Sequence, residues 1–581
     1  MIHPSSGFRL GVALLLLVPV SPSRSAEAPA TAPTPASVAR AERLRSYWER
    51  TDFPARIDSV RVTADRIHFA IHAAAPPSGT ALHLAEIRPH EDVTQPPQGR
   101  YPRAFALPVR GADGALAFDI QRVLPVYDQI FSKWAVIARS ADPQAPDTLL
   151  SHAVHGTDLT AAAARPDLPP VTARTKKGLA GIHPDPALFP DLVELGIGHL
   201  THNITLGSLL REKAGPDTLS HDYAGRTYHF AKAGVATIDR VTSFAHQHGI
   251  VVSAIILVPN LPDRQSWAGR VLTHPEAHPS GIYSLANVAT FEGITHYAAA
   301  MRFLAERYSR PDSPLGRIAH WIIHNEVDSG WVWTNAGHQP AAVYLDDYAK
   351  SMRIAYQAVR SYDPLGKVHI SLTHNWTRSH LPKDPRFFPS RHLLGLLNRL
   401  SRLEGDFEWG LAFHPYPQSL FHPRTWEDVG ARNDPDSPYI TFRNIEVLDR
   451  WMQQPAYRYQ GKTVRTILLS EQGFHTPDTS ETSQATQAAA LAYAWKKIAP
   501  IASIEAFHYH RWIDHEREGG LNLGLWTVKP GTITLPLAKK KSWEVFRALD
   551  TPGEAAAVEF AKPIIGIEDW SGIALPPAPV P

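Results

Sequence analysis

Two short segments decide how this sequence folds, Trp321-Ile-Ile-His-Asn-Glu-Val327 and Thr466-Ile-Leu-Leu-Ser-Glu-Gln472. Each is an apolar run that closes on a glutamate, Glu326 in the first and Glu471 in the second. Strands covered by helices on both faces lose the alternation of polar and apolar residues, so both runs predict buried parallel strands. A carboxylate is costly to bury, and one placed where such a strand ends therefore indicates a use.

The same pattern repeats along residues 176–550, where apolar strands alternate with amphipathic helices. Eight such strand-helix units predict an α/β fold, the (β/α)8 or TIM barrel, in which functional side chains gather at the carboxyl ends of the strands. The eight strand candidates are residues 178–182, 198–203, 250–258, 319–325, 367–374, 409–414, 465–470 and 504–510.

The chain begins with a targeting pattern. Arg9 precedes the apolar residues 10–20, which are too short to span a bilayer but are typical of a signal peptide, and small residues near Ala26 suit cleavage. A secreted chain with no cysteine fits a bacterial exterior or periplasm best.

The remaining boundaries follow from composition and pattern. Short alternating strands before the barrel predict a small β-sandwich, and a proline-rich stretch follows it. The predicted segments are a signal peptide at 1–26, an Ala/Pro-rich leader at 27–45, the β-sandwich at 46–165, a linker at 166–175, the barrel at 176–550 and a C-terminal tail at 551–581.

Composition excludes several classes of function. The 581 residues are 44% hydrophobic and 20% charged, which is typical of a globular protein, and the formal net charge of +2 gives no reason to expect a nucleic-acid partner. The absence of cysteine excludes disulfides, thiolate zinc sites and thiol nucleophiles. The sequence has no second long apolar run, so no membrane span is predicted. It also has no phosphate-binding motif that would indicate a nucleotide cofactor.

Asn325-Glu326 at the end of the fourth strand and Glu471 at the end of the seventh resemble the signature of clan A retaining glycoside hydrolases. The resemblance covers the barrel and implies that Glu326 is the general acid/base and Glu471 the nucleophile. In that case the two carboxyl groups lie about 5–5.5 Å apart, whereas about 6.5–9.5 Å indicates an inverting enzyme. Trp331-Val-Trp333, His414-Pro-Tyr416 and residues 511–526 are also similar to an uncharacterised family of secreted bacterial barrel proteins, which brings no activity with it.

The resemblance implies further roles. Asn325 would bond the sugar 2-hydroxyl, Tyr416 would hold Glu471 in place, and Trp512 would form an aromatic platform under the sugar. The arginine that the clan often has on strand two is missing, since His199, His202 and Asn203 stand there. The other strand-end residues predicted to contact a carbohydrate substrate are His183, Asn203, Trp333, His374, Trp376, His414 and His510. Residues 223–228 predict a β-hairpin lid.

Two alternatives stay open. The 30 histidines suit a metal-dependent hydrolase, and His508-Tyr-His510 places two imidazoles on one strand face, but only His183 on strand one joins them, so no metal and no cofactor are predicted. A barrel that keeps its sugar cleft and lacks turnover would be a carbohydrate-binding protein. Retention of both carboxylates favours a glycosidase acting on an oligo- or polysaccharide.

Overall fold

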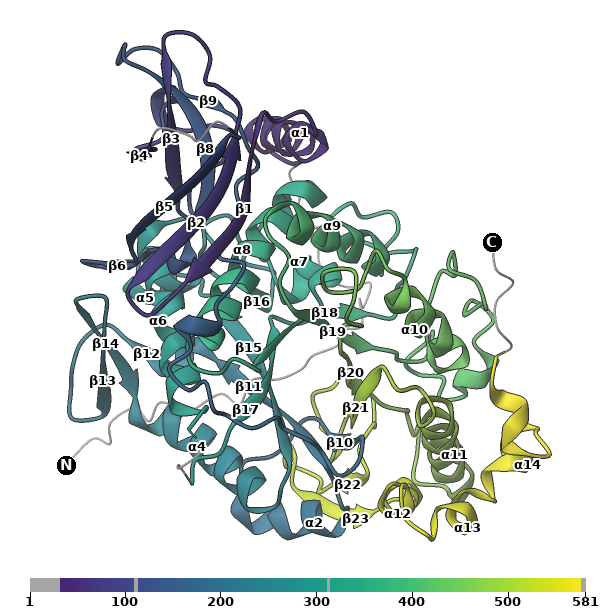
Figure 1. Ribbon diagram of the computed structural model, residues 1–581. Coiled ribbons are helices and arrows are strands. Elements are labelled where there is room, and N and C mark those ends of the chain that lie inside the picture. The colour runs from purple at the N-terminus through teal and green to yellow at the C-terminus, as the bar shows by residue number, and fades with distance from the viewer. Residues whose placement is uncertain (1–31, 109–112, 311–313, 576–581) are drawn as a thin grey trace.

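The computed structural model describes residues 32–108, 113–310 and 314–575 (Figure 1). The predicted signal peptide at 1–26 lies outside these residues. Eight parallel strands close on themselves, because each strand pairs with the next along the chain and the last, β21, pairs with the first, β10. The predicted TIM barrel is therefore confirmed. Its strands are β10 (Lys177–Leu179), β11 (His199–Thr205), β15 (Val251–Pro259), β17 (Ile318–Ile323), β18 (Lys367–Thr373), β19 (Trp409–His414), β20 (Ile467–Gln472) and β21 (Ile504–Tyr509).

Helices form the outer ring of the barrel (Figure 1). They bury their apolar faces against the strands, which are buried along nearly their whole length and so show the continuous apolar runs expected of a parallel sheet. The main helices are α2 (Phe189–Glu194), α4 (Lys232–Gln247), α6 (Phe291–Arg307), α8 (Ala341–Arg360), α9 (Ser390–Leu403), α10 (Ile445–Gln453), α11 (Glu481–Ile498) and α12 (Lys541–Ala548).

Imidazole rings occupy part of the barrel interior. His199 and His508 lie with ring centroids 5.7 Å apart, and glycines on neighbouring strands make room for such rings. A Cβ on Gly178 would come within 2.8 Å of His199, and one on Gly410 within 2.4 Å of His369. Burial lowers the pKa of His199 to about 3 and holds the pKa of His369 and His508 well below the usual range. These histidines are neutral core residues, which accounts for part of the histidine content without a metal.

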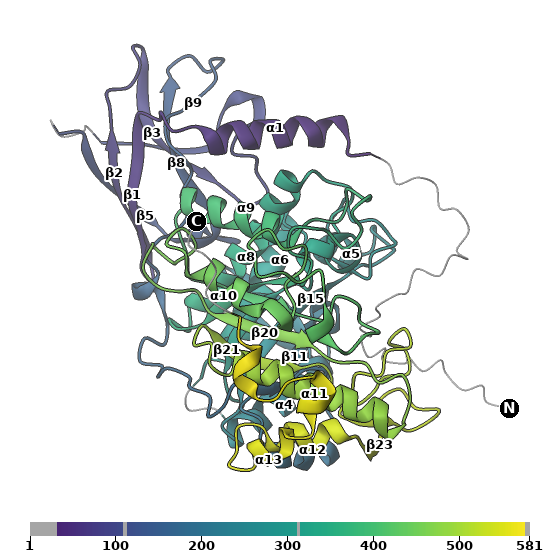
Figure 2. The same ribbon diagram turned by 90° about the vertical axis from the view of Figure 1, so that its right-hand side faces the viewer.

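Two antiparallel sheets precede the barrel, as predicted (Figure 2). They pack face to face, with the rings of Phe69 and Trp134 5.0 Å apart in an edge-on contact. One sheet has the order β1-β2-β5 and the other β4-β3-β8-β9. Their bounds are β1 (Ala55–Val62), β2 (Arg66–Ala73), β5 (Ala115–Gln121), β4 (Arg103–Ala106), β3 (Thr80–Ile87), β8 (Lys133–Ser140) and β9 (Thr148–Leu149).

Part of the segment predicted as a leader is a helix. Helix α1 (Pro35–Glu49) begins at the N-cap Thr34, with proline in its first turn, where no backbone N–H is needed. Arg40 on α1 makes ion pairs with Asp346 at 2.6 Å and Asp347 at 2.8 Å, at the start of α8. The leader prediction for residues 35–45 was wrong because this segment buries an apolar face and a charged side chain against the barrel.

The predicted hairpin exists but is not a lid. Strands β13 (Thr218–Tyr223) and β14 (Arg226–Ala231) pack outside the barrel on α6, where Phe230 stacks on Phe303 at 3.9 Å. The hairpin tip contacts the N-terminal region: the carbonyl of Ala224, at the tip, accepts a hydrogen bond from the Val126 N–H at 2.6 Å. The apolar side chains of the hairpin pack on α6. The burial of this apolar surface stabilises the hairpin outside the barrel and not over its mouth.

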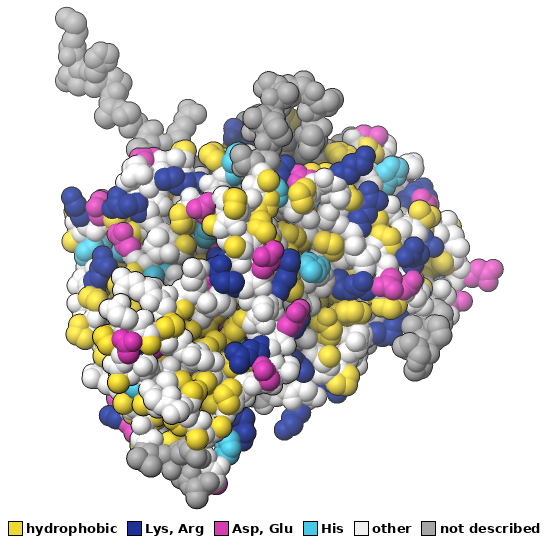
Figure 3. Space-filling model, turned by 90° about the horizontal axis from the view of Figure 1, so that it is seen from above, with side chains coloured by type: hydrophobic (Ala, Val, Ile, Leu, Met, Phe, Trp, Pro, Cys, Tyr) yellow, Lys and Arg dark blue, Asp and Glu magenta, His cyan; other side chains and the backbone are white. Residues whose placement is uncertain are grey.

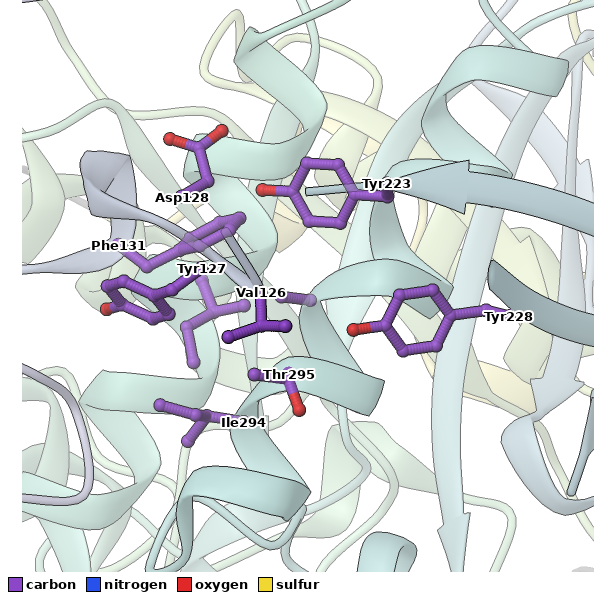
Figure 4. A pocket seen from close by; sticks show the side chains of 10 residues that line it. Val126, Tyr127, Asp128, Phe131, Tyr223, Tyr228, Ile294 and Thr295 are labelled. Atoms are coloured by element: carbon purple, nitrogen blue, oxygen red, sulfur yellow. The ribbon is translucent and has the colours of Figure 1, made fainter. Parts of the chain in front are cut away.

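A small cavity lies where the hairpin meets the N-terminal sheets and α6. Figure 4 shows the hairpin residues Tyr223 and Tyr228 around it, with Val126 and Thr295 facing them. Its volume is about 10 Å³, which is the room of about one water molecule. It is a packing defect of a three-way junction and too small for an organic ligand.

The C-terminal segment is not a loose tail. Helices α13 (Glu554–Val558) and α14 (Ala561–Ile565) follow α12, and the indole of Trp495 on α11 donates to Glu554 at 2.9 Å. Across the described part of the chain, no helix has both the length and the apolar character that crossing a membrane requires. Figure 3 shows basic and acidic side chains mixed over the face seen from above, as the small net charge leads one to expect.

A buried ion pair joins the N-terminal sheets to the barrel and gives the first prediction. Lys133 on β8 and Glu404 after α9 lie 2.5 Å apart, with 4% and 7% of their side chains exposed. Glu404→Ala leaves the Lys133 charge buried and unpaired, so we expect the free energy of unfolding in urea to fall by about 3–5 kcal/mol. Glu427→Ala, which removes the exposed partner of Arg424, serves as control and should cost under about 1 kcal/mol. Equal effects of the two changes would contradict this account.

Candidate active site

Glu326 stands in a tight turn at the carboxyl end of β17. Its φ is 39° and that of His324 is 63°, both in the left-handed region that non-glycine residues avoid. The surrounding strands hold this turn: the Glu326 N–H donates to the Ser371 hydroxyl at 3.0 Å, and Asp328 accepts from the Thr373 N–H at 3.0 Å. These hydrogen bonds hold the strained turn at the strand end, and the turn directs the carboxyl group of Glu326 to the barrel mouth.

A ring of three hydrogen bonds links Glu326 to two neighbouring strands. The His414 Nδ1 lies 3.0 Å from the Glu326 carboxyl oxygen, and its Nε2 lies 3.4 Å from the hydroxyl of Ser371. The Ser371 oxygen in turn accepts the Glu326 N–H. When Glu326 is ionised, each donor has one acceptor: the serine hydroxyl donates to Nε2, and Nδ1–H donates to the carboxylate. His414 is fully buried, so the ring fixes the orientation of the carboxyl group.

Glu471 lies near the end of β20 and is 4% exposed. The Tyr416 hydroxyl donates to its Oε1 at 2.9 Å. Burial beside this carboxylate keeps the pKa of Tyr416 well above its usual value, so the phenol remains a donor throughout the neutral range. The contact between Tyr416 and Glu471 that the resemblance implied is therefore present, with the phenol as the donor.

The two glutamates share one site. Glu326, His414 and Glu471 each offer an atom, and these atoms all lie within 4.8 Å of one another. One carboxyl oxygen of Glu326 is thus within 4.8 Å of one of Glu471. Two carboxyl groups this close on one barrel rim can act on the same bond of a ligand.

The electrostatic environment gives Glu326 a proton at neutral pH. Burial raises its pKa from the ordinary 4.5 to about 7, while the positive potential of His510 and a hydrogen bond from Trp333 act in the opposite direction. Burial also lowers the pKa of His414, which keeps this imidazole neutral. A carboxyl group with a pKa near the working pH is suited to both donating and accepting a proton.

A second carboxylate orients His510 at the end of β21. The Nε2 of His510 lies 2.7 Å from Glu518, and the Arg511 guanidinium donates to the other oxygen of Glu518 at 3.2 Å. Both His510 and Glu518 are 1% exposed, and the Nδ1 of His510 has no partner among the described residues. Glu518 fixes the tautomer of the ring and leaves Nδ1 for a ligand. Glu518 could not be predicted from the sequence, because it stands in a polar loop.

Several other predicted residues lie around the mouth. Trp333 stacks on Tyr283 beside Glu326, and His374 stacks on Tyr439. Asn325 is buried and its Oδ1 has no partner among the described side chains. Two further residues, His183 and Asn203, are half-buried after β10 and within β11.

Two predicted sugar contacts do not reach the site. Trp512 is 1% exposed, and its indole donates to Asp191 at 2.6 Å, together with the indoles of Trp526 at 2.9 Å and Trp543 at 3.0 Å. Trp376 is fully buried and donates to the Pro435 carbonyl. The chain turns away from the barrel axis after these strands end, so both rings pack between helices and loops. The prediction of a platform at Trp512 and a contact at Trp376 was wrong.

The histidine pair of the metal alternative does not assemble. His508 faces the Leu469 carbonyl at 3.3 Å inside the barrel, whereas His510 bonds to Glu518. Within the described residues, the group whose geometry could hold a metal ion is Glu326, His414 and Glu471. Imidazole and carboxylate ligands of this kind suit zinc or manganese.

Residues 169–573 match the family described as "Family of unknown function (DUF5722)". The chain belongs to this family. No curated protein matches the sequence. Solved structures with a similar fold include a family 39 glycoside hydrolase from Bacteroides cellulosilyticus WH2, with 12% identity over 84% of this chain and 80% of that one and a TM-score of 0.43.

Two further solved structures share the barrel with this DUF5722 chain. The β-glucuronidase from Bacteroides uniformis is 11% identical over 85% of this chain and 51% of its own, with a TM-score of 0.35. The family 1 β-glucosidase from Thermotoga maritima is 15% identical over 62% and 84%, with a TM-score of 0.39. Likeness at this level does not extend to function.

The raised pKa of Glu326 gives the second prediction for this DUF5722 protein. In ¹³C NMR of protein labelled at its glutamate carboxyl carbons, the Glu326 signal is identified by its disappearance in the Glu326→Gln variant. This signal should titrate with a midpoint near pH 7, with the carboxyl group protonated below that pH and ionised above it. Trp333→Phe removes a hydrogen bond to the ionised form and should move the midpoint upward. A midpoint near 4.5, unmoved by the Trp333 change, would contradict the described environment.

Proposed function

We propose that this protein is a retaining glycoside hydrolase with Glu326 as general acid/base and Glu471 as nucleophile. The observation that carries the proposal is the pair of buried carboxyl groups at the carboxyl ends of β17 and β20, with an oxygen of one within 4.8 Å of an oxygen of the other. Such a pair provides one acid and one base from the same residue type.

In the first step, the Glu471 carboxylate attacks the anomeric carbon while Glu326 gives its proton to the leaving oxygen. The glycosidic bond breaks, an ester bond to Glu471 forms, and the leaving group departs as an alcohol. Glu326 holds a proton for this step because burial raises its pKa to about 7. The Tyr416 hydroxyl holds Glu471 with one oxygen bonded and one free.

In the second step, Glu326 acts as base. It takes a proton from a water molecule, whose oxygen attacks the anomeric carbon and releases Glu471 as carboxylate. His414 holds the carboxyl group of Glu326 in place during both steps, and its Nδ1–H can donate a hydrogen bond to the ionised form.

The substrate side of the mouth offers groups that bind hydroxyls. The Asn325 Oδ1 and the His510 Nδ1 are buried atoms without a partner in the described part of the chain, and Trp333 presents an aromatic wall. His374, His183 and Asn203 lie farther out. We assign these six residues to sugar binding, and propose an oligo- or polysaccharide substrate met after secretion or in a bacterial periplasm.

A metal-dependent hydrolase is the second candidate, and the grouping of Glu326, His414 and Glu471 is what favours it. It is the weaker one, because His414 Nδ1 already bonds to Glu326 and a cation would have to break that bond.

Separate alanine changes test the two roles. On aryl glycosides of the sugar that the wild-type protein hydrolyses fastest in a panel, Glu326→Ala should lower kcat/KM by about 10²–10⁴-fold for poor leaving groups and far less for dinitrophenyl, whose departure needs no acid. Azide should restore turnover in both variants. The azide product should keep the substrate's anomeric configuration with Glu326→Ala and invert it with Glu471→Ala.

Glu427→Gln, an exposed glutamate on the loop after β19, is the matched control and should leave turnover unchanged. Unchanged turnover in both active-site variants would refute the assignment. Activity that survives them and is abolished by a chelator would favour the metal alternative, and binding of glycans without hydrolysis by the wild-type protein would favour a binding barrel.

A further inference from the structure

A surface groove outside the catalytic mouth lies between α9 and the region of α10. Its volume is about 540 Å³, within the range of small-molecule sites, about 300–1,000 Å³. The side chains that decide its chemistry are Arg391, His392 and Arg399 from α9, Trp451 from α10, Tyr457 after α10, and Thr377.

The groove is basic. Arg391 and Arg399 line it, and Arg45 lies close enough to lower the pKa of His392 beyond the effect of burial, which leaves that ring neutral. No Asp or Glu is among the side chains that line the groove. One carboxylate, the exposed Asp436, pairs with Arg391 at 2.6 Å from the side. Arg399 uses one nitrogen to bond the Trp48 carbonyl at 3.1 Å, and its guanidinium has further donors.

Aromatic rings form one wall. Trp451 and Tyr457 lie with centroids 5.3 Å apart, and the edge-on ring of Trp376 fixes Trp451 from the core side at 5.5 Å. The Arg391 guanidinium is 5.4 Å from the Trp451 ring. A fixed, half-buried aromatic side chain beside a planar cation is a surface on which a pyranose ring and a charged substituent can both be held.

Gly395 supplies an independent observation. It lies in the middle of α9, where glycine is less favourable than alanine because its backbone loses more conformational freedom. Packing does not require it, because a Cβ there would meet only the Tyr457 hydroxyl, at an ordinary 3.7 Å. The absence of a side chain at this point leaves the floor of the groove open. An open floor makes room for a ligand but does not contribute to the packing of the fold.

We propose that this groove is a second saccharide-binding site that takes an oligosaccharide bearing carboxylates, such as a uronate chain. The planar donors of Arg391 and Arg399 match carboxylates, and Trp451 and Tyr457 face the sugar rings. Thr377, at the edge of the groove, is three residues beyond His374 in the loop that follows β18. The site holds an acidic glycan, and its binding needs neither catalytic glutamate.

Calorimetric titration of the Glu471→Gln protein with tetragalacturonic acid and with cellotetraose tests the site without turnover. We expect the acidic tetrasaccharide to bind, more weakly as salt is raised, and the neutral one to bind at least about 10-fold less tightly. Arg399→Ala should weaken acidic binding about 10-fold or more through loss of a charge-assisted hydrogen bond. Gly395→Leu should block the groove with no change in charge.

Arg402→Ala is the matched control, because Arg402 is on the same helix, bonds to the Pro455 carbonyl and does not line the groove. It should leave the affinity unchanged, and thermal melting checks that each variant folds. Failure of the acidic tetrasaccharide to bind, equal binding of the neutral one, or wild-type affinity in both Arg399→Ala and Gly395→Leu would overturn the proposal. Hydrolysis of a small aryl glycoside by otherwise wild-type protein should be untouched by either change, so the groove and the catalytic assignment fail separately.

Discussion

The hydrogen-bonded ring of Glu326, His414 and Ser371 is the constraint on which the site depends. It holds a non-glycine residue in a left-handed turn, keeps a carboxyl group buried and leaves the neighbouring imidazole neutral. Burial of a carboxyl group is unfavourable for its charged form, and here that cost appears as a pKa raised to about 7. Glu471 is held by a different partner, the phenol of Tyr416.

The rest of the barrel keeps this arrangement rigid. Three neighbouring strands each supply one side chain of the site: Ser371 comes from β18, His414 from β19 and Glu471 from β20. The parallel pairing of these strands sets the spacing of the three side chains. Below them the interior is filled by neutral imidazoles that fit against glycines on adjacent strands. Outside, Asp191 accepts three indole N–H groups and fixes the segment after β21, which carries His510 and Glu518. Rigid support of this kind is what a site needs to hold reacting groups in place.

The sequence was sufficient where a repeating pattern carried the information. Eight apolar runs predicted the barrel, and their order placed Glu326 and Glu471 on one rim. The sequence was not sufficient where tertiary contacts decide the outcome. Loops set the direction of a side chain beyond the end of a strand, so position at a strand end does not reveal that Trp512 bonds to Asp191 or that Trp376 is buried. Glu518 and Ser371 escaped notice because a loop glutamate and an interior serine have no periodic signal. The hairpin at 218–231 was recognised by its turn, but its partner, Phe303 on α6, is remote in sequence.

The anomeric configuration of the first product tests the central claim most directly. Proton NMR of a glycan that the wild-type protein hydrolyses, recorded before the free sugar equilibrates, reports it without any variant. Two successive displacements at the anomeric carbon, first by Glu471 and then by water, restore its configuration, so the account predicts a first product with the same anomeric configuration as the substrate. A first product of inverted configuration would contradict it.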